Sequence, residues 1–326
     1  MKQDERDDNP QQPAYWERQL VQKLVFEQQA ENRRARRWSN FFKLAMLAYL
    51  IVILLLMNKD WFDFSADKLT KKKHTAVVDL NGLIAEGKAA NADDVVAGLR
   101  DAFEDDNTKG VILRANSPGG SPVQSSLINK EITRLREKYP DTPIYATVGD
   151  MCASGCYYII SAVDKIYVDE SSLVGSIGVR MDGFGFVDAM KKLGVERRLL
   201  TAGEHKGILD PFQPEREDEK QFVEKMLAEV HQQFIDVVKA GRGDRLADDP
   251  DLFSGLFWVG RKSIELGLAD EIGSAGTVAR DVIKAEKIVD FTQKEDLFSR
   301  LADRIGASIA TTLMQLGSSG GNQVMR

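Results

Sequence analysis

Strand-like and helix-like segments alternate along most of this chain, and this alternation limits its fold more than any other feature. The run GVILRA at 110–115, for example, is followed by SSLINKEITRLREKY at 125–139, whose apolar residues recur at helical spacing. The other strand-like segments are 75–85, 143–149, 165–170 and 195–203, and the other helix-like segments are 92–105, 155–163, 186–194 and 214–243. The pattern predicts an α/β domain with mainly parallel strand pairing. In such domains functional residues gather where strands end and helices begin.

The apolar run FFKLAMLAYLIVILLLM at 41–57 predicts one transmembrane helix ahead of this domain. Its only charged residue is Lys43, and about 17 residues is the lower limit for spanning a bilayer. A buried core helix is disfavoured because both flanks are strongly polar. The run lies too far from the N-terminus for a removable signal peptide and lacks a cleavage site of small residues. Arginines at 33, 34, 36 and 37 predict a cytoplasmic N-terminus, although lysines also follow the run.

Five segments are expected along the chain. They are a cytoplasmic N-terminal segment (1–40), the transmembrane anchor (41–57), a linker (58–73), the α/β domain (74–285) and a C-terminal helix with a flexible tail (286–326). The C-terminal helix has apolar residues at helical spacing, so it could pack on its own domain, cover a neighbouring subunit or touch the membrane surface.

Charge and cysteine content exclude several classes of partner. The formal net charge of -6 leaves no basic excess, which argues against nucleic-acid binding. The two cysteines, spaced C-x3-C, do not supply the four ligands of a structural zinc site, and we expect no metal or other cofactor. On one helical face Cys152 and Cys156 could pair only under strain, so we expect two small buried thiols.

Two motifs of small residues follow neighbouring strands. In RANSPGGSP (114–122), Gly119 and Gly120 can adopt conformations closed to other residues, so that their amides can point at an oxygen. In VGDMCASGCYY, Ser154 stands at the predicted start of a helix, where amides are unpaired. These features predict acyl transfer, in which Ser154 attacks a carbonyl and the amides of Gly120 and Gly155 hold the resulting oxyanion.

A serine hydroxyl needs a base to become a nucleophile. TAGEHKGILDPF (201–212) places His205 and Lys206 side by side in a predicted loop. A lysine can act as a base where its surroundings desolvate it and so lower its pKa. His74 opens the domain beside a run of lysines, and His231 falls within the long helix, where we expect it on the surface. Spacing alone does not choose between His205 and Lys206.

The combination of NSPGG, ASGCYY, LVGSIGV, TAGEHKG and WVGRKSIELGLADEIG resembles the signal peptide peptidase A group of the S49 serine peptidase family, in its short, single-domain form. The resemblance covers roughly residues 75–285. It implies a Clp protease/crotonase-like β-α spiral core and a serine/lysine dyad. Matched by motif, Ser154 is the nucleophile, Lys206 the general base and Ser176 the hydroxyl that orients the lysine amine. The family usually has glycine at the position of Cys156, whose side chain could narrow a pocket or react with thiol reagents.

The same resemblance implies a membrane-anchored serine endopeptidase that cleaves hydrophobic peptides such as signal-peptide remnants. It places the anchor in a bacterial inner membrane, with the peptidase domain on the periplasmic side, and implies a homo-oligomer whose active sites are shared between subunits. A crotonase-like acyl-CoA enzyme is an alternative on the same fold, disfavoured by the anchor and by the Ser154/Lys206 pair. A catalytically inactive membrane scaffold is a second alternative, disfavoured because Ser154, Lys206 and Gly120 are intact.

Overall fold

The computed structural model describes residues 23, 36–52 and 72–293, which form parts of two compact units, Met1–Leu69 and Thr70–Arg326. In the first unit, residues 36–52 are helical and their apolar side chains are exposed. Among the described residues, no helix has both the length and the apolar character that a membrane crossing requires. Residues 53–57 of the predicted anchor, the linker to residue 71 and the C-terminal segment from 294 lie outside the described residues.

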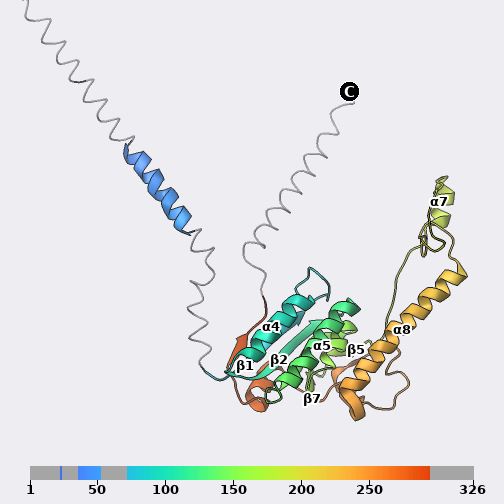
Figure 1. Cartoon of the computed structure of the whole chain (residues 1–326). Helices are drawn as coiled ribbons and strands as arrows, with labels where there is room; N and C mark the ends of the chain where they lie inside the picture. Colours follow the sequence, from blue (N-terminus) through green and yellow to red (C-terminus); the bar gives the residue numbers. More distant parts are fainter. Residues whose placement is uncertain (1–22, 24–35, 53–71, 294–326) are drawn as a thin grey trace, which may run out of the picture. The chain divides into compact units, whose positions relative to one another are not determined.

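The second unit is built on an eight-stranded sheet (Figure 1). Its strands run in the order β6-β5-β3-β2-β1-β8, while β4 pairs with β3 and with β7. The pairings are parallel except for β5 with β6. The strands are β1 (His74–Asn81), β2 (Thr108–Ser117), β3 (Ile144–Ala153), β4 (Lys165–Val168), β5 (Leu173–Gly175), β6 (Phe257–Val259), β7 (Glu271–Ile272) and β8 (Ile288–Asp290). The predicted α/β class with mainly parallel strands is confirmed, and β8 extends the sheet past residue 285.

Helices cover the sheet and pack its core. The described helices of the second unit are α4 (Ala92–Glu104), α5 (Pro122–Lys138), α6 (Gly155–Ile160), α7 (Val187–Leu193), α8 (Glu217–Arg242), η2 (Gly243–Arg245), α9 (Gly260–Glu265), α10 (Ala275–Thr277) and the π-helical turn η3 (Val278–Val282). Figure 1 shows α4 and α5 side by side along one face of the sheet. In β1, Ala76 and Val78 belong to the main core, whereas Val77 packs with Val278 in a smaller cluster. Because both faces of the sheet are buried, its central strands contain nearly uninterrupted runs of apolar residues.

The helices that follow β1 and β2 begin at specific capping residues. The Asn91 side chain accepts a hydrogen bond from the Asp94 amide at the start of α4. The Ser121 side chain accepts one from the Gln124 amide at the start of α5, and Pro122 occupies the first helical position. Both arrangements satisfy amides that a helix leaves unpaired and fix where the loops end. The loop before α5 therefore ends directly after Gly119 and Gly120.

The predicted strand at 195–203 is wrong, because this segment has no regular secondary structure through residue 201. A strand must pair with a neighbour, and the segment lies in a projecting part of the chain without one. Its apolar residues gain little burial there, since Leu200 is 96% exposed. Instead Arg197 pairs with Asp210 at 3.0 Å and stacks on the ring of Phe212.

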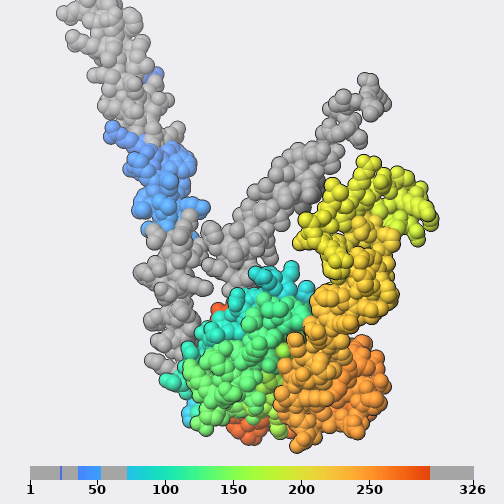
Figure 2. Space-filling view, turned by 45° about the vertical axis from the view of Figure 1, so that its right-hand side comes forward, coloured from blue at the N-terminus to red at the C-terminus, as the bar shows by residue number. Residues whose placement is uncertain are grey.

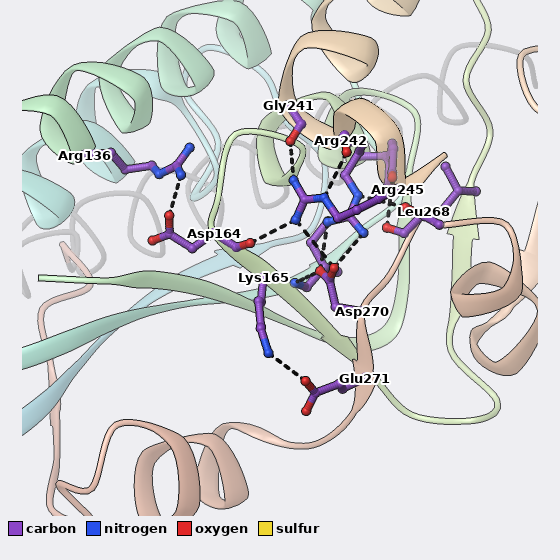
Figure 3. Close-up of polar contacts among 12 residues, drawn as sticks. Arg136, Asp164, Lys165, Gly241, Arg242, Arg245, Leu268, Asp270 and Glu271 are labelled. Atoms are coloured by element: carbon purple, nitrogen blue, oxygen red, sulfur yellow. Dashed lines mark hydrogen bonds and ion pairs between the residues drawn. The ribbon is translucent and has the colours of Figure 1, made fainter. Parts of the chain in front are cut away.

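Residues 180–229, called the arm below, project from the sheet (Figures 1 and 2). The arm carries α7, which has no buried residue, and the first half of α8. The C-terminal half of α8 packs on the body, where Phe234 contacts Tyr158 of α6. Arg242, at the end of α8, is buried and binds Asp270 through two hydrogen bonds (Figure 3). The arm is thus held to the sheet through the C-terminal end of α8.

Stability should depend on pH through Glu131, which joins α5 to α4. Hydrogen bonds from Arg134 and Arg100 outweigh the effect of burial and lower the pKa of the Glu131 carboxyl to about 2 from an ordinary 4.5. Because its folded pKa is depressed, this carboxylate stabilises the fold above about pH 4.5, and the contribution is lost as pH falls towards 2.

The measurement is the free energy of urea unfolding for the wild type and Glu131→Gln as a function of pH. The difference between them should be largest near neutral pH and should shrink towards pH 2. Glu137→Gln, at an exposed position of the same helix, is the matched control and should show little difference at any pH. A Glu131 difference that stays constant with pH would contradict this assignment.

Candidate active site

Ser154 lies at a sharp turn between β3 and α6. Its backbone has φ 53° and ψ -123°, a conformation that residues other than glycine rarely adopt. The Ser154 amide donates to the Gly175 carbonyl at 2.9 Å, and its own carbonyl accepts from the Tyr158 amide at 3.0 Å. A half-buried serine on a strained strand-to-helix turn is typical of nucleophilic serines.

A pair of glycines lies directly against this turn. Gly119 and Gly120 have φ values of 97° and 152°, in the region that favours glycine. A Cβ at Gly119 would stand 2.7 Å from the Gly155 nitrogen, and a Cβ at Gly120 would stand 2.1 Å from the Ile84 carbonyl oxygen. The sequence indicated both glycines as able to adopt this conformation, and it predicted only Gly120 as an oxyanion donor.

The amides of Gly120 and Gly155 are the candidate oxyanion donors. Ile84 forms a bridge with the glycine loop, in which its amide donates to Gly119 and its carbonyl accepts from Ser121. This bridge does not use the Gly120 amide. Gly155 is the first residue of α6, so its amide has no acceptor within the helix. Because the Gly120 nitrogen lies 3.2 Å from where a Gly155 Cβ would be, the two donors share one small region.

Ser176 follows β5 and lies close to the Ser154 turn. It has a positive φ of 54°, and its amide donates to the Leu256 carbonyl at 2.7 Å. Its neighbour Gly175 accepts the hydrogen bond from Ser154. His231, expected on the surface, is half-buried instead, with its Nε2 atom 3.0 Å from the Ile177 carbonyl oxygen. The long helix brings this histidine to the loop after β5, which helical spacing alone does not reveal.

Lys206 and His205 are exposed and lie in the arm. They occupy a series of turns in which the Lys206 amide donates to Gly203. The loop is held to the start of α7 by a hydrogen bond from Phe186 to Pro211 at 2.7 Å. Within residues 72–293, no hydrogen bond or ion pair joins Lys206 to the site around Ser154. Figure 1 shows α7 far from β5. One chain therefore brings together Ser154, Gly155, Gly120 and Ser176, but not Lys206.

The expectation of two free thiols is wrong, since Cys152 and Cys156 form a disulfide. The two residues do not share a helix, because Cys152 belongs to β3 and Cys156 to α6. The turn at Ser154 brings their Cα atoms to 5.2 Å, within the range that a disulfide spans. Both residues are fully buried. Cys156 thus presents no thiol to a substrate or to a thiol reagent in this state.

Other candidate sites lie away from Ser154. Among the residues that the structure describes, no three His, Cys, Asp or Glu side chains are grouped so that they could hold a metal ion. A hollow of about 450 Å³ is lined by residues such as Glu104, Asp106 and Lys109. It lies where α4 ends and β2 begins, whereas Ser154 follows the C-terminal end of β3. The hollow is not part of the site around Ser154.

Comparison with known proteins gives the family. Residues 136–289 match the model of peptidase family S49. A putative signal peptide peptidase SppA of Enterococcus faecium is 30% identical over 249 residues, which are 73% of this chain and 72% of that protein. Protease 4 of Haemophilus influenzae is 32% identical over 225 residues, 68% of this chain and 35% of that protein.

A third relative has a different name. The Na⁺/H⁺ antiporter NhaA of Brucella abortus is 46% identical over 182 residues, 56% of this chain and 25% of the antiporter. This chain therefore spans about a quarter of the length of that relative. The family match includes Ser154 and runs from the end of α5 into β8. The chain belongs to peptidase family S49.

Proposed function

We propose that this protein is a membrane-anchored serine endopeptidase that uses Ser154 as nucleophile and Lys206 as general base. The observation that carries the proposal is the Ser154 turn, with its positive φ and the glycine loop packed against it. Acyl transfer requires a hydroxyl beside backbone amides that can hold an oxyanion, and this arrangement supports that role for Ser154. Family membership supports peptide bonds as the substrate.

In the proposed reaction, the neutral Lys206 amine takes the proton from the Ser154 hydroxyl as its Oγ atom attacks the peptide carbonyl. The amides of Gly120 and Gly155 donate to the oxyanion that forms. The Ser176 hydroxyl orients the lysine amine. The protonated amine then gives its proton to the leaving amine, and water, activated by the same lysine, hydrolyses the acyl-enzyme.

We further propose that the lysine comes from a neighbouring subunit of a homo-oligomer. The position of Lys206 supports this, because the arm that carries it projects from the sheet (Figure 1) and the Lys206 amide donates to Gly203 of the same arm. The arm also exposes large apolar side chains, among them Phe184 at 81% and Leu193 at 78%. Exposed apolar patches of this kind mark interaction surfaces.

Two features support anchoring in a bacterial inner membrane with the peptidase unit in the periplasm. The first is the apolar run at 41–57 with arginines before it. The second is the Cys152–Cys156 disulfide, because disulfides persist mainly in oxidising compartments. A relative is named a putative signal peptide peptidase. Hydrophobic peptides left in or near the membrane, such as signal-peptide remnants, are the proposed substrates.

The test combines covalent labelling with peptide cleavage by the full-length protein in detergent. A fluorophosphonate should label Ser154 in the wild type and not in Ser154→Ala, and a library of hydrophobic peptides should be cleaved only by the wild type. Ser171→Ala, at an exposed serine before β5, is the matched control and should behave as the wild type. Absence of both labelling and cleavage would favour an inactive scaffold. Acyl-CoA turnover that survives Ser154→Ala would favour a crotonase-like enzyme.

A further inference from the structure

The Cys152–Cys156 disulfide encloses the candidate nucleophile in a short covalent ring. The two cysteines are separated by 4 positions, and Ser154 is the middle residue between them. On one side, Cys152 is held in the sheet, where it pairs with Ser117 of β2 and with Val174 of β5. On the other side, Cys156 lies in the first turn of α6. The bond therefore ties both ends of the Ser154 turn to each other.

The turn consists of a strained residue, Ser154, followed by a glycine, Gly155. Ser154 has a positive φ, which persists only where the surrounding structure enforces it. Its neighbour Gly155 cannot carry a side chain, because a Cβ there would stand 2.5 Å from the Ser125 hydroxyl oxygen. Glycine also has more backbone freedom than any other residue. The disulfide spans this glycine and limits the conformations that the turn can reach.

Packing adds to this constraint. Both cysteines are 0% exposed and belong to the main core. Two unbonded thiols need more room than a bonded pair, and protein cores are close-packed. Opening the bond would therefore displace one or both flanks of Ser154, and β3 is held in place by strands on both sides. We therefore expect the start of α6, and not β3, to shift.

We propose that Cys152 and Cys156 are positioning residues whose disulfide holds Ser154 and the Gly155 amide in the reactive geometry, so that peptidase activity depends on the oxidised state of this bond. The inference rests on the proposed function. In the reduction, a dithiol breaks the S–S bond, each cysteine gains a hydrogen, and the dithiol is oxidised to a cyclic disulfide. The reduced enzyme still binds peptide but acylates slowly.

The test compares oxidised and dithiothreitol-reduced full-length protein, with the bond state checked by thiol alkylation under denaturing conditions. Reduction should lower kcat and the rate of fluorophosphonate labelling by roughly ten- to a hundredfold, since small displacements of reacting groups have effects of this size. KM should change little, and reoxidation should restore kcat. The double variant Cys152→Ala/Cys156→Ala should have a low kcat that dithiothreitol does not change. If dithiothreitol does not reduce the buried bond, the test is the kcat of this double variant compared with the kcat of the wild type.

Rates are expressed per active site titrated with the fluorophosphonate, so that misfolded protein is not counted. A bond with only a structural role would lower the melting temperature and leave kcat per titrated site unchanged, and that result would overturn the inference. Two free thiols in protein purified without reductant would overturn it as well. Failure of the proposed function is a different outcome, in which the oxidised wild type is neither labelled nor active.

Discussion

Replacing Lys206 by arginine is expected to lower kcat for peptide cleavage by roughly 10²- to 10⁴-fold, the usual contribution of a general base. Arginine keeps the positive charge and the length, but it stays protonated and cannot accept the serine proton. His205→Ala, at the neighbouring position of the same exposed loop, is the matched control and should keep most activity. Loss of cleavage in a correctly folded His205→Ala protein would show that histidine is the base.

The same variant tests whether sites are shared between subunits. Co-expressed Ser154→Ala and Lys206→Arg chains are each inactive alone. If serine and lysine come from different chains, equal mixing should restore about a quarter of the sites, because half of the serines and half of the lysines are intact and combine at random. If each chain supplied both residues to its own site, mixing would restore nothing. The expected regain is measured as kcat per total chain against the wild type.

The sequence predicted the elements whose apolar pattern is set by burial on the sheet. The strand-like run at 110–115 falls within β2, the run at 143–149 overlaps the first half of β3, and the long helical pattern at 214–243 corresponds to α8. The glycine loop and Ser154 follow adjacent parallel strands, so their meeting at one edge of the sheet could also be predicted.

Features that depend on tertiary contacts could not be predicted in this way. The segment at 195–203 has strand-like residues, but no strand lies beside it to pair with, so it does not form a strand. The disulfide depends on the turn at Ser154, whose positive φ places Cys152 and Cys156 on different elements at bonding distance. The position of Lys206 depends on the direction of the arm, which is fixed by contacts at the far end of α8.

Those contacts centre on Arg242 and Asp270, which join α8 to the segment before β7 (Figure 3). The Arg242 side chain is 0% exposed and also donates to the Gly267 carbonyl. Asp270 accepts from the Ile166 amide of β4, and Arg245 donates to the Asp164 carbonyl nearby.

Burial opposes ionisation of Asp270, but the hydrogen bonds from Arg242 and Ile166 outweigh it and keep the pKa of this carboxyl below its ordinary value. The segment also accepts a hydrogen bond from Tyr157 of α6 at Leu268, so it contacts both the C-terminal end of α8 and the nucleophile helix.

Asp270→Asn is therefore expected to lower the free energy of unfolding by about 3–5 kcal/mol, because it leaves the Arg242 guanidinium buried without its counter-charge. Glu271→Gln is the matched control at the next position. It removes only the exposed pair with Lys165 and should cost at most about 1 kcal/mol. Both are measured by urea unfolding near neutral pH. Because the Asp270 pKa is depressed, the difference in the free energy of unfolding between wild type and Asp270→Asn should become smaller as pH falls through the acidic range, where the wild-type carboxylate is protonated.

The assignment would be contradicted if Asp270→Asn and Glu271→Gln lowered the free energy of unfolding equally. The buried pair would then not hold α8 in place, and the apolar contacts of Phe234 and Val238 would have to set the direction of the arm.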